Sequence, residues 1–358
     1  MLAELVLRHG AAWRALGDWE TRRLADRLVR IPIDRPVFIA GLARAGTTIL
    51  LRKLCERPGF VAHRYADFPF LFTPYAWATL RRLVPARAQA PRERMHKDRI
   101  TITAESPEAM EEVLWMAFFP DLHDPARSNV LDASTSRPDF EAFLADHIRK
   151  LLLARGGGRY VSKNNYDVTR LSYLARLFPD ARFLLPVREP EAHVASLMKQ
   201  HALFCRVQGS NPAARRHLRL AGHFEFGLDR RPINPGDGAS VGAIEACWAR
   251  GDEARGWAKY WAAIYGHVLE RLDGDPALAG RSLVVRYEEL CDQPAATMTA
   301  VCRHVGLPAA ESGQLAEGLS RPDYYTPRFT PEERAAIAEE TEAVAGRLYQ
   351  CGTPSSCR

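Results

Sequence analysis

A glycine-containing loop between an apolar run and a helical stretch constrains this chain more than any other feature. The loop reads Gly41-Leu42-Ala43-Arg44-Ala45-Gly46-Thr47-Thr48. PVFIAG (36–41) before it predicts a buried strand, and TTILLRKLCER (47–57) after it has helical spacing with a threonine at its start. Two glycines five apart let the backbone curl so that its N–H groups face an anion, and the helix N-terminus adds positive potential. We therefore expect an α/β fold with an anion-binding loop.

The loop matches only part of the nucleotide-binding pattern. It fits GxxxxG, but Thr47 stands where a nucleotide-hydrolysing loop carries lysine, so the full Walker pattern fails. The positive charge lies inside the loop instead, at Arg44. A plain strand-to-helix turn would use the same glycines, so the loop needs support from other residues.

The rest of the chain alternates between apolar runs and helical stretches. The predicted strands are FVAHRY (60–65), RYVSKN (159–164), RFLLPVR (182–188) and SLVVRYEEL (282–290). The predicted helices cover 106–119, 138–154, 167–180, a stretch from Pro190, 244–272 and a stretch after Pro294. This alternation predicts a P-loop-like parallel sheet flanked by helices on both faces.

We expect one domain over residues 1–358. Residues 1–30 read as an amphipathic helix packed on it, although contact with a membrane surface is the alternative. Two stretches, 66–130 and 203–243, read as helical and loop insertions, with 207–243 loop-like. The insertions are expected to form the side of the protein that receives a second substrate.

Composition narrows the class of protein. The chain has 49 basic and 43 acidic residues, and 47% of its residues are hydrophobic, which excludes a disordered or collagen-like chain. Basic and acidic residues are interleaved, so no nucleic-acid partner is expected. No apolar run reaches the length of a membrane span and no targeting signal is evident. Seven scattered cysteines without a CxxC pair favour the cytoplasm and no metal site, and whether Cys351 and Cys357 pair stays open.

Two further motifs lie at the ends of predicted strands. Arg188, in Pro186-Val187-Arg188-Glu189-Pro190, ends one strand, and Ser196 follows on the next helix. Arginine offers a two-pronged donor for phosphate, although an arginine at a strand end is often a surface ion pair. Lys163 ends another strand and is one of only six lysines, although it could also be a solvated strand terminus. Open α/β sheets bind ligands at this edge, so the three motifs are expected to share it.

These motifs resemble the sulfotransferases that use 3′-phosphoadenosine 5′-phosphosulfate (PAPS). The resemblance runs from about 36 to 307 and includes RAGTT, SKN, FPDARFLLPVREPEAHVAS and VVRYEEL. It is closest to the bacterial and Golgi-type branch, whose loop reads PRSGTT. It implies transfer of a sulfuryl group from PAPS to an alcohol or phenol by in-line displacement.

The resemblance also implies roles for single residues. Those that would wrap the 5′-phosphosulfate are Arg44, Ala45, Gly46, Thr47 and Thr48. Arg188 and Ser196 would hold the 3′-phosphate, and Lys163 would neutralise the leaving phosphate. Arginine and lysine can supply the charge that a metal supplies in phosphoryl transfer, so no metal is expected.

The loop and the catalytic base depart from the family pattern. Ala43 and Ala45 replace a proline and a serine of the loop, and Asn165 stands where cytosolic members carry a catalytic histidine. A base must reach the acceptor hydroxyl and titrate near neutral pH. His96 and Asp67 are the two favoured candidates. The other residues considered are His63, Glu111 and Glu112.

Three features carry less weight. The aromatic residues of 66–77 could stack on an acceptor or simply pack in the core: Phe68, Phe70, Phe72, Tyr75 and Trp77. The arginines of 214–220 could meet an anionic acceptor or form a solvated helix face. Tyr287 is expected at the structural end of the last strand.

The sequence therefore predicts a PAPS-dependent sulfotransferase whose acceptor is a small-molecule, glycan or lipid hydroxyl. A P-loop kinase is the enzymatic alternative, and a non-catalytic nucleotide- or RNA-binding module is the other. The missing loop lysine disfavours the kinase. No pattern in the sequence identifies the acceptor or the oligomeric state.

Overall fold

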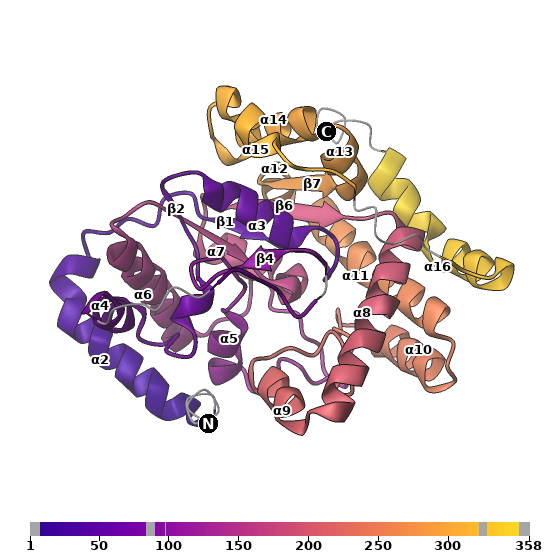
Figure 1. Cartoon of the computed structure of the whole chain (residues 1–358), viewed down its shortest axis with the longest axis horizontal. Helices are drawn as coiled ribbons and strands as arrows, with labels where there is room; N and C mark the ends of the chain where they lie inside the picture. Colours follow the sequence, from indigo (N-terminus) through magenta and orange to yellow (C-terminus); the bar gives the residue numbers. More distant parts are fainter. Residues whose placement is uncertain (1–7, 84–89, 97, 322–327, 351–358) are drawn as a thin grey trace.

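The computed structural model describes residues 8–83, 90–96, 98–321 and 328–350. Its centre is a five-stranded parallel sheet in the order β2-β5-β1-β6-β7, so β1 lies in the middle (Figure 1). The strands are β1 (Val37–Ile39), β2 (Phe60–Val61), β5 (Arg159–Lys163), β6 (Arg182–Val187) and β7 (Ser282–Arg286). A separate antiparallel pair joins β3 (Arg92–Glu93) to β4 (Thr101–Ile102). The predicted α/β fold with a parallel sheet is confirmed.

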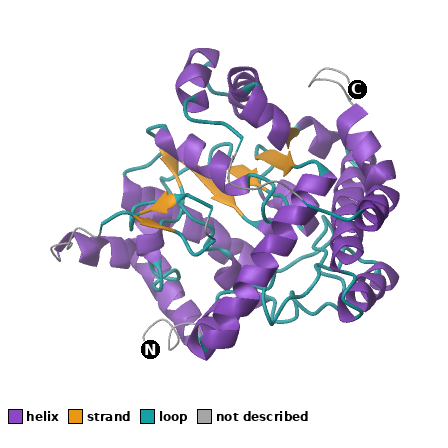
Figure 2. Cartoon of the chain, turned by 45° about the vertical axis from the view of Figure 1, so that its right-hand side comes forward, coloured by secondary structure: helices purple, strands orange, loops and turns teal. Residues whose placement is uncertain are grey.

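Helices cover both faces of this sheet (Figure 2). The helices that precede β6 are α2 (Gly10–Leu28), α3 (Thr47–Glu56), α4 (Pro74–Leu83), α5 (Glu112–Phe118), α6 (Pro138–Arg155) and α7 (Leu171–Leu177). Those from β6 to β7 are α8 (Pro190–Ser210), α9 (Pro212–Leu220), α10 (Gly238–Ala249), α11 (Glu253–Gly274) and α12 (Pro276–Gly280). The last ones are α13 (Tyr287–Asp292), α14 (Pro294–Val305), α15 (Ser312–Ala316) and α16 (Pro331–Gln350).

Alternation along β1 divides the core into two layers. Phe38 packs with residues of α6, α7 and α11 on one face. Val37 and Ile39 pack with residues of α3 and α14 on the other. A strand that is buried on both faces has a continuous run of apolar residues. The run 36–41 therefore predicted β1 correctly.

Side-chain caps account for most of the helix boundaries that the sequence missed. The stretch 207–243 is loop-like only over 221–237, because α8 extends to Ser210, Asn211 then caps α9 through Ala214 N, and α10 begins at Gly238. The predicted helix over 244–272 is two helices, separated at Gly251, whose φ is +78°, and α11 is capped by Asp252. In each case a local polar side chain satisfies the backbone groups that a longer helix would have paired.

Three predicted elements are shorter than expected. The strand over 60–65 ends at Val61, because the chain then turns into a single 3-10 turn, η1 (Tyr65–Asp67). The helix over 106–119 begins only at Glu112, since Glu108 N donates to His63 O and holds the preceding residues against η1. The helix over 167–180 is divided into η2 (Asn165–Thr169) and α7.

Candidate functional site

The glycine loop joins the carboxyl end of β1 to the first turn of α3. Arg44 and Gly46 have positive φ values of 76° and 99°, which curl the backbone at this point. A side chain at Gly46 would place its Cβ 2.9 Å from the ring of Tyr287, so only glycine fits. The first turn of α3 thus opens directly onto the curled loop, as an anion site requires.

Three residues predicted to bind the donor meet beside this loop. Arg44 Nε donates to Ser196 Oγ of α8 at 3.2 Å. Arg188, which follows β6, points Nη1 toward the carbonyl oxygen of Arg44 at 3.5 Å. The loop, the end of β6 and α8 therefore bring two guanidinium groups and a hydroxyl into one cluster.

Tyr287 belongs to this cluster, which corrects the expectation that it ends a strand. β7 ends at Arg286, and Tyr287 begins α13. The guanidinium of Arg188 lies 4.7 Å from the centre of the Tyr287 ring, a cation–π contact. Arg188 Nε is buried and makes no hydrogen bond within the described ranges. Tyr287 thus supports both Gly46 and Arg188.

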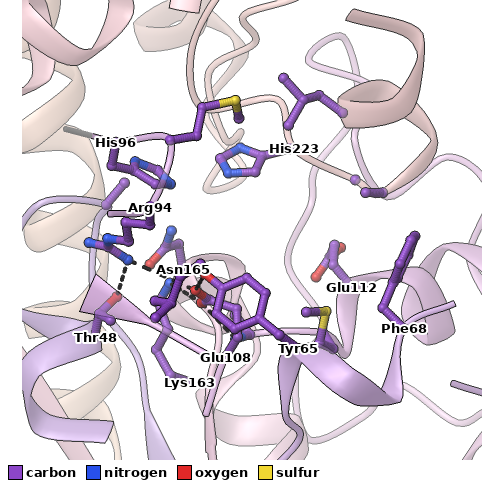
Figure 3. A pocket seen from close by; sticks show the side chains of 18 of the residues that line it. Thr48, Tyr65, Phe68, Arg94, His96, Glu108, Glu112, Lys163, Asn165 and His223 are labelled. Carbon is purple, nitrogen blue, oxygen red and sulfur yellow. Dashed lines mark hydrogen bonds and ion pairs between the residues drawn. The ribbon is translucent and has the colours of Figure 1, made fainter. Parts of the chain in front are cut away.

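Lys163 lies at the end of β5, next to the loop in the sheet. Its Nζ is 4.0 Å from Glu108 Oε1 (Figure 3). Burial lowers the pKa of Lys163, Glu108 opposes this shift, and Arg94 and Arg44 add to it. Lys163 is therefore a buried ammonium whose charge the carboxylates of Glu108 and Glu225 offset only in part.

A cavity of about 800 Å³ opens beside these residues. Of the predicted donor-binding residues, it is lined by Arg44, Thr47, Thr48 and Lys163. The other walls come from residues of 90–113 and 217–226. Arg188 and Ser196 do not line it; they contact Arg44 from behind.

Arg94 and Asp98 connect one wall of the cavity to the loop, and no sequence motif pointed to either residue. Asp98 Oδ2 lies 2.7 Å from Arg44 Nη1 and 2.5 Å from Arg94 Nη2. Arg94 Nη1 also donates to Thr48 Oγ1 at 3.3 Å. Burial alone would raise the pKa of Asp98, but Arg94 and Arg44 hold it well below its usual value. A buried carboxylate thus neutralises the loop arginine.

His96 lines the cavity, as a candidate base must. Its ring lies 5.2 Å from that of Phe204 and 5.9 Å from that of His223, measured between centres. Burial, and then the charge of Arg94, lowers the pKa of His96 well below its ordinary value. Burial and the neighbouring charges therefore disfavour the imidazolium form of His96.

Asp67 does not line the cavity. Its carboxylate pairs with Arg155 at 2.6 Å and accepts a hydrogen bond from Arg64 N at 2.8 Å. Burial would raise the pKa of Asp67, but His63 and Arg155 hold it well below the usual value. His63 is itself buried against His147. Asp67 therefore fixes η1 rather than facing a substrate.

Of the two neighbouring glutamates, only Glu112 lines the cavity, and its oxygens are fully engaged. Arg170 donates two hydrogen bonds to it at 2.8 and 2.9 Å, His123 lies at 2.6 Å, and Asn164 donates at 2.8 Å. Burial raises the pKa of Glu111 well above its usual value, with Asp167 adding to the shift. Neither carboxylate is free to take a proton from a ligand in the cavity.

His223 and Glu225 form a pair that the sequence analysis missed. His223 Nδ1 lies 2.6 Å from Glu225 Oε2, and both residues line the cavity. Asn165 Nδ2 donates to Glu225 Oε1 at 2.9 Å. The only signal in the sequence is the spacing His-Phe-Glu inside an insertion, which by itself is unspecific.

The aromatic stretch divides between core and cavity. Phe68 lines the cavity, where its ring meets that of His217 edge-on. Phe70 packs between Trp13 and Trp77, and Phe72 is buried in the main core. The arginines of 214–220 lie on α9, whose Leu218 faces the cavity.

Neither a metal-binding cluster nor a membrane-spanning helix occurs among the residues placed by the structure. No group of three or more histidine, cysteine, aspartate or glutamate side chains is arranged to hold a metal ion there. None of the helices in that part of the chain is long and apolar enough to cross a membrane. Cys351 and Cys357 lie outside it, so their pairing stays untested.

Comparison with known proteins points to one family. The model of the sulfotransferase family matches residues 36–221, which is more than half of the chain. Sulfotransferase STF1 from Mycobacterium tuberculosis H37Rv matches with a TM-score of 0.50 and 18% identity, over 95% of this chain and 84% of that one. Sulfotransferase STF9 from Mycobacterium avium matches with a TM-score of 0.53 and 14% identity, over 95% and 83%. At these identities the two structures show a shared fold. No curated protein matches significantly in sequence.

Proposed function

Because this chain belongs to the sulfotransferase family, we propose that it transfers a sulfuryl group from PAPS to an acceptor hydroxyl by in-line displacement. One observation carries the proposal, the meeting of Arg44, Arg188 and Ser196 beside the first turn of α3. A 3′-phosphorylated donor has two separate anionic groups, and a cluster with two guanidinium groups can serve both.

The glycine loop is proposed to bind the 5′-phosphosulfate. The residues assigned to this role are Arg44, Ala45, Gly46, Thr47 and Thr48. Thr47 and Thr48 begin α3, where N–H groups lack partners within the helix. Arg44 adds a guanidinium on the cavity side, where Asp98 pairs with it. The loop therefore offers both the helix dipole and the positive charge that an anionic phosphosulfate group requires.

Arg188 and Ser196 are proposed to bind the 3′-phosphate. Arg188 Nε is a buried donor without a hydrogen-bond partner in the described ranges, which is costly unless a ligand supplies the acceptor. The Tyr287 ring keeps the guanidinium in place, so little side-chain entropy is lost on binding. These properties fit an anion site.

Lys163 is proposed to neutralise the leaving phosphate. The acceptor oxygen forms a bond to sulfur while the bond from sulfur to the bridging phosphate oxygen breaks, and negative charge grows on that oxygen. A buried ammonium stabilises such charge more strongly than a solvated one. The lowered pKa of Lys163 indicates that its charge still lacks compensation.

The acceptor is proposed to enter the cavity beside the loop. Its walls include Phe68, Met110, Val113, Leu218 and Phe226, so the body of the acceptor would meet mainly apolar side chains. Of the two bases favoured by the sequence, only His96 lines this cavity. Arg44 and Lys163 complete the set of groups proposed to act on the reacting atoms.

Calorimetric titration with adenosine 3′,5′-bisphosphate (PAP), the by-product of PAPS, tests the donor site. We expect wild-type protein to bind PAP without magnesium and to prefer it to ATP with magnesium. Arg188→Ala should weaken PAP binding about 10- to 100-fold, the effect of losing a charge-assisted pair of hydrogen bonds. Arg303→Ala, which changes an exposed arginine of α14, is the matched control and should bind PAP like the wild type.

A preference for ATP with magnesium would instead favour the P-loop kinase. A steep dependence of binding on salt with an RNA probe would favour the nucleic-acid module. Failure to bind PAP at all would reject the proposed donor.

A further inference from the structure

We propose that His223 accepts the proton of the acceptor hydroxyl and that Glu225 orients it for this step. The pair would supply the catalytic base that the motifs of the sequence leave unassigned. This inference rests on the proposed function, and it concerns residues in the connection between α9 and α10, far along the chain from the donor-binding loop.

The orientation of the His223 ring suits this role. Nδ1 lies 2.6 Å from Glu225 Oε2, an ion-pair distance, although the angles of this contact are not those of a hydrogen bond. The other nitrogen, Nε2, makes no hydrogen bond to any residue that the structure describes. Figure 3 shows the ring projecting into the cavity on the side opposite Lys163 and Tyr65. Glu225 therefore lies against one ring nitrogen, and the ring borders the space proposed for the acceptor.

The pair is anchored from both sides. Asn165 Nδ2 donates to Glu225 Oε1 at 2.9 Å, which ties Glu225 to the turn that follows Lys163. Between the two residues, Phe224 N donates to Tyr166 Oη at 3.0 Å. The Phe224 ring also packs on His123, with ring centres 4.8 Å apart. The segment therefore holds the imidazole at a fixed place relative to the end of β5, as a general base requires.

The charges around His223 stabilise the imidazolium that forms when the ring accepts a proton. Burial lowers the pKa of His223, but the Glu225 carboxylate outweighs burial and raises it above the ordinary value. Lys163 opposes this shift and Glu108 supports it, while the His96 and His217 rings face the same space. Glu225 stays ionised, because His223 and Asn165 overcome burial and lower its pKa to about 2. The surroundings of His223 therefore favour its imidazolium form more than those of His96 do.

The step balances as follows. The acceptor O–H proton passes to His223 Nε2, and the acceptor oxygen forms the new bond to sulfur. The bond from sulfur to the bridging oxygen breaks, and its electron pair stays on the 5′-phosphate of PAP beside Lys163. The products are a sulfate ester, PAP and an imidazolium paired with Glu225, which then releases its proton to water.

The test compares His223→Asn and Glu225→Gln with the wild type. PAP affinity is measured first by calorimetry, and all variants should stay within about threefold of the wild type, since neither residue touches the donor cluster. The rate is then measured as release of PAP from PAPS with 4-methylphenol as the probe acceptor, which counts transfer to the phenol and to water alike. His267→Asn is the matched control, a histidine in α11 outside this cavity.

We expect His223→Asn to lower the rate about 100- to 1000-fold, within the range for loss of a general base. Glu225→Gln should lower it about tenfold and move the acid limb of the pH–rate profile to lower pH, since the carboxylate that raises the pKa of His223 is gone. The wild-type rate should rise with pH as His223 loses its proton. His267→Asn should turn over like the wild type.

Two results would overturn the proposal, and they differ from failure of the proposed function. If His223→Asn binds PAP normally and its rate stays above a third of the wild-type rate, His223 is not the catalytic base. If His96→Asn loses activity and His223→Asn does not, His96 is the catalytic base. Absence of PAP binding in the wild type would instead reject the proposed function, and the inference would fall with it.

Discussion

The donor edge and the acceptor wall of this protein are built in different ways. The donor edge consists of the loop 41–48 with Lys163, Arg188 and Ser196. It sits at the carboxyl ends of β1, β5 and β6, which are neighbours in the sheet, so backbone pairing sets the positions of its residues. The acceptor wall consists of the described residues of 90–113 and 217–226, where little regular structure occurs.

Buried ion pairs hold the acceptor wall together. Asp98 bridges Arg94 and Arg44, and Glu112 is bonded to Arg170. Such pairs are costly to break because a lone charge is left buried. A change in the wall should therefore affect stability, whereas a change in the donor edge should affect binding with less effect on the fold. The predictions below test this difference.

Glu112→Ala should have the largest effect, on the free energy of unfolding. It removes the carboxylate that pairs with Arg170, a guanidinium whose side chain is only 1% exposed. We expect a loss of about 3 kcal/mol in urea unfolding, the lower end of the usual cost of breaking a buried pair, because Asp167 still lies 3.6 Å from Arg170.

Glu105→Ala is the matched control, because it breaks two ion pairs, to Arg64 and Arg81, at a side chain that is 54% exposed. It should cost less than about 1 kcal/mol. The pKa of Glu112 is held below its unfolded value, mainly by Arg170 against burial. Its contribution is therefore present above the unfolded pKa and lost as the pH falls. A small loss at neutral pH would contradict the role of ion pairs in the wall.

Gly46→Ala tests the donor edge and has Gly59→Ala as its control. Both glycines have a φ of 99°, but a Cβ at Gly59 meets nothing within 4 Å, whereas one at Gly46 lies 2.9 Å from the Tyr287 ring. Strain alone should cost about 1 kcal/mol at Gly59, and strain with displacement of the ring about 2–3 kcal/mol at Gly46. Thermal unfolding measures both.

PAP titration completes the Gly46 test. Displacing Tyr287 moves the support of Arg188, so PAP binding should weaken in Gly46→Ala and stay unchanged in Gly59→Ala. Equal losses of stability in the two variants would show that the contact with Tyr287 carries no energy.

The two regions also explain what the sequence could predict. The strands β1, β5 and β6 are short apolar runs, and a parallel sheet places their carboxyl ends together, so the positions of Arg44, Lys163 and Arg188 at one edge followed from local patterns. The predicted helix boundaries were wrong where a single capping side chain sets the boundary, as at Asn211 and Asp252.

The acceptor wall could not be read in the same way. Its contacts join residues far apart in sequence, such as Glu112 with Arg170 and Asn165 with Glu225. The spacing of residues in the sequence does not predict such pairs, because they depend on side-chain contacts and not on backbone pairing in the sheet. The same reason placed Asp67 among the candidate bases, since its partner Arg155 is 88 residues away.

Asp98→Asn tests the point where the wall meets the edge. The carboxylate lies 2.7 Å from Arg44 and would repel an incoming phosphate. We expect PAP to bind about 3- to 10-fold more tightly to the variant, most clearly at low salt. Asp124→Asn, at an exposed ion pair with Arg127, should bind PAP like the wild type. Weaker binding in Asp98→Asn would mean that Asp98 instead positions Arg44 for the donor.

Ser196→Ala should have the smallest effect, and it separates two roles for the hydroxyl. Ser196 Oγ accepts a hydrogen bond from Arg44 Nε at 3.2 Å and lies in the cluster proposed for the 3′-phosphate. Loss of one hydrogen bond, about 1 kcal/mol, should weaken PAP binding about fivefold. Adenosine 5′-phosphate, which lacks the 3′-phosphate, should bind the variant and the wild type alike in calorimetry. Ser210→Ala, at the exposed end of α8, controls for loss of a helix hydroxyl. If both nucleotides lose affinity equally, Ser196 acts only by holding Arg44 at the loop, and the 3′-phosphate depends on Arg188 alone.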